Sequence, residues 1–170
     1  MKKIFLLLFL SCIFSSCDDG DITLESFNFE NQEIQECTTN DLIFKTKGDE
    51  LLLLSLPENV FNTVFANAPT NDTPRTVTIN GSNKIIYRKY TGTVSNATVC
   101  ATIPVSSPTV TKEWNATGGS ISIETNEITN TSGTVTGYTH NITFLNVNFA
   151  SIDNSFSFVS YVFGDYETSN

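Results

Sequence analysis

Short stretches that alternate apolar and polar residues, separated by turn-forming residues, recur along most of this sequence. Ser120-Ile121-Ser122-Ile123-Glu124 has the clearest period of two. Arg75-Thr76-Val77-Thr78-Ile79 also alternates, and Asn80-Gly81 then predicts a hairpin turn that leads back along residues 85–90. The chain has 24 Thr and 18 Asn but only 6 Ala, which favours strands and turns over helices. We therefore expect an all-β fold of about eight to ten strands.

Three less regular segments extend this pattern. Residues 51–56 form a continuous apolar run that ends at Pro57, which predicts a strand buried on both faces. Residues 60–65 fit either a short strand or one helical turn. Residues 99–103 are expected to form a strand, followed by a crossing loop over residues 104–108.

The alternation changes phase twice near the end of the chain. In residues 138–149 the phase slips between Phe144 and Leu145, so that apolar residues before and after the slip point to opposite faces. A similar slip lies between Phe158 and Val159. Paired slips in neighbouring strands indicate a bulge or a bend between two packed sheets. We therefore predict an antiparallel β-sandwich.

The first residues have the composition of a signal peptide. Lys2 and Lys3 precede an apolar stretch, residues 4–14, interrupted only by Ser11 and Cys12. These 11 residues are far fewer than the roughly 20 that cross a bilayer as a helix, which argues against a transmembrane anchor.

The residues after this stretch indicate lipidation. Phe14-Ser15-Ser16-Cys17 resembles the bacterial lipobox, in which small residues precede a cysteine whose thiol takes a diacylglycerol. Phe9-Leu10-Ser11-Cys12 is a rival match, but it leaves a shorter apolar run and no polar residues downstream. We therefore predict that Cys17 is lipidated and holds the chain on a lipid bilayer, because two or three acyl chains anchor a protein almost permanently.

Asp18, Asp19 and Asp21 follow Cys17 directly. In lipoproteins of the Bacteroidota, such an acidic cluster resembles the signal for export to the cell surface. We therefore expect an outer membrane lipoprotein on the cell surface. The alternative is the periplasmic face of the outer membrane, with the acidic residues serving only as a solvated tether.

The predicted organisation has four parts. They are the signal peptide at residues 1–16, the lipidated cysteine and short acidic tether at 17–21, a single β-sandwich domain at 22–164 and a tail at 165–170. Removal of Lys2 and Lys3 leaves 7 of the 9 basic residues against 18 acidic ones, a balance of −11. Such a charge argues against nucleic acid as a partner, because phosphate binding needs a basic face.

Two cysteines stay available for a disulfide. Cys12 leaves with the signal peptide and Cys17 is lipidated, so Cys37 and Cys100 are expected to bond in an oxidising envelope compartment. Two buried free thiols are the alternative. We expect no metal site and no cofactor, since His140 is the only histidine and no second cysteine pair exists.

No catalytic pattern supports an enzyme. A Ser-His-Asp triad would need His140, but the chain has no G-x-S-x-G motif, and we expect His140 to face solvent from its strand. Most carboxylates fall in predicted loops, where a glycosidase pair or a calcium site would have to assemble from separate segments. We therefore predict a non-catalytic protein, and keep a small hydrolase as a remote alternative.

The best binding candidate lies on the predicted strand at residues 84–90. Arg88 stands between Tyr87 and Tyr90 in the only dense basic and aromatic cluster of an acidic chain. Together with Trp114 these residues could form a platform for a glycan or an envelope protein. Packing of the same aromatic rings in the core is the commoner arrangement, so the platform is only the first candidate for a binding site.

The whole mature region resembles a group of small lipoproteins of flavobacteria that have no established activity. The resemblance rests on these segments: Cys17-Asp18-Asp19-Gly20-Asp21, Phe27-Asn28-Phe29, Cys37, Lys84-Ile85-Ile86-Tyr87-Arg88, Cys100, Ser107-Pro108 and Glu113-Trp114. It implies a location and no chemistry. The sequence thus predicts a membrane-anchored binding or accessory module of the cell envelope, with a structural or adhesion component of the outer membrane surface as the alternative.

Overall fold

The fold is described from a computed structural model, which covers residues 27–37 and 41–170. The predicted signal peptide, Cys17 with its acidic tether, and residues 22–26 of the expected domain lie outside the described residues. The described part is mostly antiparallel β-sheet with two short helices, so the all-β prediction is confirmed.

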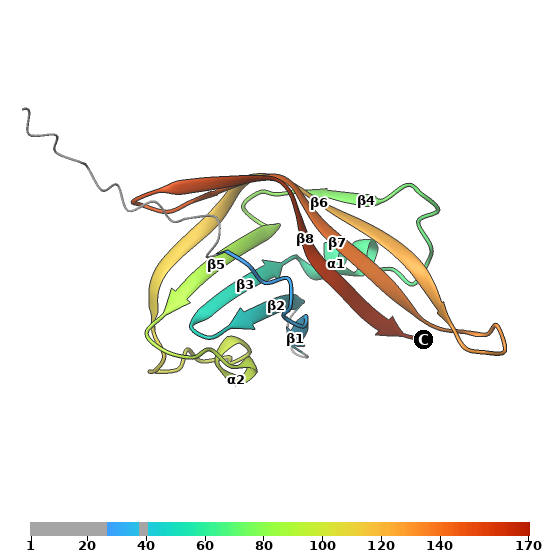
Figure 1. Cartoon of the computed structure of the whole chain (residues 1–170), viewed down its shortest axis with the longest axis horizontal. Coiled ribbons are helices and arrows are strands. Elements are labelled where there is room, and N and C mark those ends of the chain that lie inside the picture. Colours follow the sequence, from blue (N-terminus) through green and yellow to red (C-terminus); the bar gives the residue numbers. More distant parts are fainter. Residues whose placement is uncertain (1–26, 38–40) are drawn as a thin grey trace, which may run out of the picture.

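Eight strands and two helices follow one another along the described chain (Figure 1). They are β1 (Gln35–Cys37), β2 (Leu42–Lys47), β3 (Glu50–Ser55), α1 (Glu58–Val64), β4 (Arg75–Thr78), β5 (Lys84–Tyr90), α2 (Asn96–Val99), β6 (Val110–Thr129), β7 (Val135–Ala150) and β8 (Ser155–Ser169).

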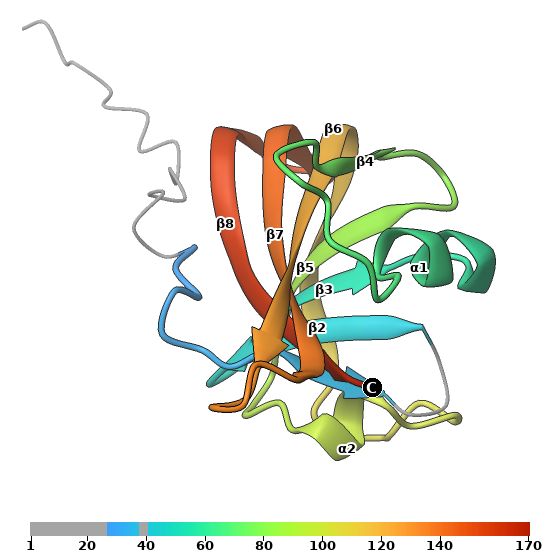
Figure 2. The ribbon, with the colours of Figure 1, turned by 90° about the vertical axis from the view of Figure 1, so that its right-hand side faces the viewer.

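All eight strands belong to one hydrogen-bonded sheet. Its order is β1-β2-β3-β5-β6-β7-β8, and β4 pairs separately with β6. The sheet curls, so that β6, β7 and β8 rise beside β2 and β3, which run across them (Figure 2). The predicted division into two separate sheets is therefore not observed, because the ladder from β1 to β8 is unbroken.

The Asn80-Gly81 turn forms, but it does not join a hairpin. The Asn80 side-chain oxygen accepts hydrogen bonds from the backbone N–H groups of Ser82 and Asn83, at 2.8 and 2.9 Å. The strands on either side both pair with β6, at different places: β5 with residues 110–115 and β4 with residues 120–123. The turn therefore carries the chain from one half of β6 to the other.

The long strands bend where the sequence changes phase. Gly119 in β6 has φ +104°, and a Cβ there would lie 2.6 Å from the Asn146 carbonyl oxygen of β7, so only glycine fits. Asn146 itself has φ +52°. Figure 1 shows that β6, β7 and β8 all bend along their length. The predicted bend is present, but Phe144 and Val147 on its two sides enter the same core, since the irregular residues restore the inward phase.

The inner surface of the curled sheet holds the main hydrophobic core. It is rich in aromatic rings, and Phe27 contacts several of them: Tyr87 at 5.0 Å, Phe158 at 4.9 Å and Tyr161 at 5.1 Å between ring centroids. Phe27 and Phe29 reach this core from an N-terminal segment that is not itself a strand. The segment lies beside β8 in Figure 2.

A second apolar cluster lies on the outer surface of β2, β3 and β5. Leu52 and Leu54 face the inner core, whereas Leu51 and Leu53 face the outer cluster, which confirms a strand buried on both faces. The Cys37–Cys100 disulfide, with Cα atoms 5.4 Å apart, closes one side of this cluster. The disulfide prediction is confirmed.

Three further segments test the sequence predictions. One resolves an alternative that was left open, and two differ from what was predicted. Residues 60–65 belong mainly to helix α1, the helical alternative. The strand predicted at 99–103 is wrong, because α2 ends at Val99 and irregular backbone follows. The predicted tail at 165–170 is also wrong, because the hydrogen-bonded pairing with β7 extends β8 to Ser169.

Candidate binding cavity on the outer face of the sheet

A cavity of about 380 Å³ lies between the outer face of the sheet and the irregular segment that follows α2. Its floor comes from strands and includes Leu42, Leu51, Leu53, Arg88 and Tyr90. Its cover includes Val99, Ala101, Pro104, Val105 and Pro108. The volume falls within the range of roughly 300 to 1,000 Å³ that is typical of small-molecule sites.

The cover is held by a few local contacts. The Ser95 hydroxyl accepts a hydrogen bond from the Thr98 backbone N–H at 3.3 Å and caps α2. Cys100 at the end of α2 is bonded to Cys37 of β1. Beyond Cys100 the cover has no regular structure, and Ile103 is 79 % exposed. The floor is therefore hydrogen-bonded sheet, whereas the cover is held by the α2 cap, the disulfide and a few further bonds, such as that from the Thr109 N–H to the Thr91 hydroxyl at 3.0 Å.

Arg88 is the cationic residue of the cavity lining, and it has an acidic partner. Its Nε donates to a Glu113 carboxylate oxygen of β6 at 2.6 Å. Burial lowers the pKa of Arg88, but the contacts with Glu113 and Tyr90 outweigh it and raise that pKa. Glu113 does not itself line the cavity; the polar residues of the lining are Arg88, Tyr90, Thr98 and Thr109, and the rest are apolar.

Two of the four predicted binding residues lie in the core instead. The side chains of Tyr87 and Trp114 are 0 % and 1 % exposed and stack at 5.0 Å between ring centroids. The Trp114 Nε1–H donates to the Asn154 side-chain oxygen at 2.7 Å. The prediction of a surface platform is wrong for these two rings, because they alternate inward while Arg88 and Tyr90 alternate outward to the cavity.

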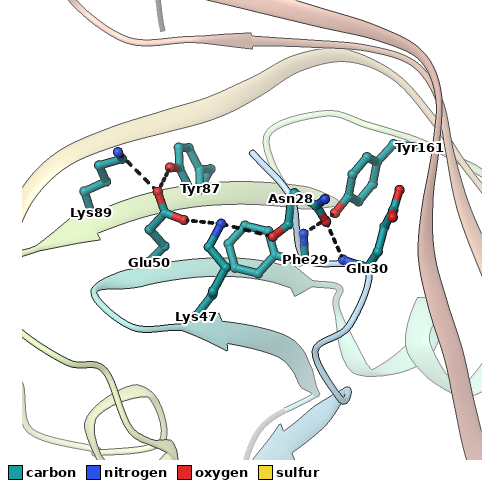
Figure 3. A network of polar contacts seen from close by, with 8 residues as sticks. All are labelled: Asn28, Phe29, Glu30, Lys47, Glu50, Tyr87, Lys89 and Tyr161. Atoms are coloured by element: carbon teal, nitrogen blue, oxygen red, sulfur yellow. Dashed lines mark hydrogen bonds and ion pairs between the residues drawn. The ribbon is translucent and has the colours of Figure 1, made fainter. Parts of the chain in front are cut away.

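A polar network lies at the edge of the inner core (Figure 3). Glu50 is 6 % exposed; its carboxylate accepts a hydrogen bond from the Tyr87 hydroxyl at 2.7 Å and pairs with Lys47 and Lys89 at 3.1 and 3.2 Å. Burial raises the pKa of Glu50, but these hydrogen bonds outweigh it and hold that pKa below its ordinary value. Burial and the bond to Glu50 raise the pKa of Tyr87. The buried carboxylate is thus held by two lysines and one hydroxyl, which is typical of a structural network.

The same network fastens the N-terminal segment. The Lys47 ammonium donates to the Asn28 carbonyl oxygen at 3.1 Å, and the Phe29 N–H donates to the Tyr161 hydroxyl at 3.3 Å (Figure 3). Lys45, which is 3 % exposed, donates to the Phe29 carbonyl oxygen at 3.1 Å. Burial lowers the pKa of Lys45, and nearby Asp165 partly opposes this. Two lysines of β2 thus satisfy backbone groups that have no strand partner.

His140 is buried and not solvent-facing, which corrects the sequence prediction. Its ring nitrogens lie 2.9 Å from the Thr125 hydroxyl and 3.1 Å from the Thr168 hydroxyl. Burial, together with the charge of Arg75, lowers the pKa of His140 to about 4. His140 has the same parity as the buried Ile142 and Phe144, so the alternation already carried this signal.

Other kinds of site find no support in residues 27–37 and 41–170. No group of three or more His, Cys, Asp or Glu side chains in this part of the chain is placed to hold a metal ion. None of its helices has the length and apolarity needed to span a membrane.

Sequence reasoning missed the residues of the cover. Residues 99–103 resemble a strand in composition, and only the pairing of Cys100 with Cys37 indicated that this segment lies near β1.

Comparisons with protein-family models, curated proteins and solved structures find no match.

Proposed function

We propose that this chain is a lipid-anchored bacterial lipoprotein that acts as a non-catalytic binding or accessory module of the cell envelope, with the outer cavity as its ligand site. The observation that carries the ligand site is the cavity of about 380 Å³ under a cover fixed by a disulfide. The anchor rests on the lipobox resemblance at Cys17 and the preceding signal peptide.

The lining favours an apolar ligand. Leu, Val, Pro and Ala residues make up most of it, and Arg88, held by Glu113, adds one charged group beside Tyr90, Thr98 and Thr109. An apolar side chain of an envelope protein, or a small apolar molecule with one polar group, would bury its surface there. A glycan fits this lining less well, because few polar side chains converge on the cavity.

The location follows from the sequence resemblances. The acidic residues after Cys17 and the resemblance to flavobacterial lipoproteins favour the outer membrane, on the cell surface rather than the periplasmic face. A disulfide between Cys37 and Cys100 suits an oxidising compartment outside the cytoplasm.

The ligand site can be tested by filling the cavity. Ala101 lines it, so Ala101→Trp should occupy the space. The lipidated protein in lipid nanodiscs would be titrated with indole, and its unfolding midpoint should rise by about 3 °C at ten times the Kd. The Ala101→Trp variant should lose this rise.

The matched control is Ala97→Trp, since Ala97 is exposed on α2 and does not line the cavity. This variant should keep the indole response. The proposal would be contradicted if Ala101→Trp had the same unfolding midpoint as the unchanged protein and that midpoint still rose with indole. Indole would then bind elsewhere.

The anchor is tested separately. Cys17→Ala should move the protein from the membrane fraction to the soluble fraction, because no acyl chain is attached. The control is Cys12→Ala, which should leave the mature protein in membranes. Membrane retention of Cys17→Ala would contradict the proposed anchor, and protease treatment of whole cells would distinguish the two faces of the outer membrane.

A further inference from the structure

The two ends of the sheet differ in what they leave unpaired. β1 is an edge of only three residues, and its Cys37 is fixed by the disulfide. β8 has 15 residues, pairs with β7 on one side, and has no strand on its other side among the residues that the structure describes. A long unpaired edge presents backbone donors and acceptors to any other extended chain.

β8 lacks the features that usually protect such an edge. Residues 155–164 contain no charged residue and no proline, and Asp165 is the first charge. Val159 and Val162 are 80 % and 56 % exposed. Natural edge strands commonly carry lysine, proline or a bulge for protection, and here a bulge occurs only at Phe163, where the register with β7 shifts.

The face pattern of β8 is symmetric about one point. From Phe156 to Val159 the side chains point inward, outward, inward and outward, and from Ser160 to Phe163 they point outward, inward, outward and inward. The centre lies between Val159 and Ser160, which are both exposed, so the observed slip is one residue later than the one predicted from the sequence. An antiparallel copy centred there would therefore match inward with inward and outward with outward over eight residues.

We propose that two copies of this chain pair through β8, antiparallel about a two-fold axis between Val159 and Ser160. This register sets Phe158 opposite Tyr161 of the other copy, and Phe156 opposite Phe163. Aromatic pairs of this kind are favourable in sheets. Val159 lies opposite Ser160, so the exposed valines lose part of their contact with water. The interface is isologous, as in most protein dimers.

Charge favours a second copy at this place. The whole chain has a net charge of −9, so copies repel one another over most of their surfaces. The uncharged stretch from residue 155 to 164 brings no like charges face to face. A partner with a basic strand would find no acidic side chain on this stretch to bind, which argues for the copy over such a partner.

Cysteine crosslinking in native membranes tests this register with the full chain. In Val159→Cys/Ser160→Cys, each new thiol would face one from the other copy, at the spacing of about 4.5 to 5.5 Å between Cα atoms that suits a disulfide. Mild oxidation should give a species of twice the protomer mass on non-reducing gels. The matched control is Ile152→Cys/Asp153→Cys, an adjacent exposed pair in the turn of the same hairpin, which should stay monomeric.

A charge on the edge provides the second arm. Val162→Lys, added to the crosslinking variant, should lower the crosslinked fraction about fivefold or more, with an unchanged unfolding midpoint showing that the fold is intact. The proposal is overturned by absence of the crosslink, by equal crosslinking of the control pair, or by a crosslinked species of another mass, which would show a strand from a different protein. It is equally overturned by Val162→Lys having no effect.

Discussion

The inner core and the outer cluster are both apolar, but they are closed in different ways. In the inner core, strands of the curled sheet surround interlocking rings such as Phe27, Tyr87 and Trp114. The outer cluster has sheet on one side only, and the irregular cover with its disulfide closes the other. The outer cluster borders a cavity of about 380 Å³, whereas the buried rings of the inner core pack directly against one another.

This difference places the aromatic core and the proposed ligand site on opposite faces of the same strands. Successive side chains of β3 and β5 point alternately to the inner core and to the outer cluster. Leu52 and Tyr87 therefore stabilise the core, while Leu53 and Arg88 line the cavity. A binding surface placed away from the core can change its cover without repacking the rings inside. Variants on the two faces should therefore behave differently.

The largest expected effect is in the inner core. Trp114→Ala removes a buried ring, its stacking on Tyr87 and the hydrogen bond that its Nε1–H donates to the Asn154 side chain. The free energy of unfolding should therefore fall by about 5 kcal/mol. Leu53→Ala on the outer face should cost only about 2 kcal/mol, because the cavity beside it already limits its packing. Urea unfolding measures both, and equal losses would contradict the distinction between the two faces.

Removal of the disulfide should come next. Cys37→Ser/Cys100→Ser opens a loop with a sequence separation of 63 residues and should lower the free energy of unfolding by roughly 4 kcal/mol in the chain-entropy picture. Amide hydrogen exchange should speed up most at α2 and the cover, because they lose their link to β1. Uniform acceleration across β6 and β7 would show instead that the disulfide supports the inner core.

A smaller effect is expected from pH. The pKa of His140 is about 4 in the folded chain and 6.5 ordinarily, so between these values the unfolded chain binds a proton that the folded chain does not. Stability should therefore fall as the pH drops from 6.5 to 4, by about 3 kcal/mol in total. His140→Gln should remove this part of the pH dependence, and a profile identical to that of the unchanged protein would contradict it.

The sequence predicted the parts of the fold that depend on local pattern. Alternation located most strands, the paired phase slips located the bend, and elimination among the cysteines paired Cys37 with Cys100. It did not predict which strands pair, because β4 and β5 both meet β6 through contacts distant in sequence. It also left open which face is inside, so Tyr87 and Trp114 stayed candidates for a surface platform although they are buried, whereas Arg88 and Tyr90 of β5 do face the cavity.

The N-terminal segment has a mechanical consequence. Phe27 and Phe29 are buried among rings from β5, β7 and β8. Two lysines of β2 donate hydrogen bonds to the backbone carbonyl oxygens of Asn28 and Phe29. If a lipid at Cys17 anchors the chain, a pulling force on the anchor reaches the described residues first at Phe27. Extraction of Phe27 and Phe29 from the core would then precede any stretching of the sheet, so this segment would be the first part of the described domain to resist unfolding by such a force.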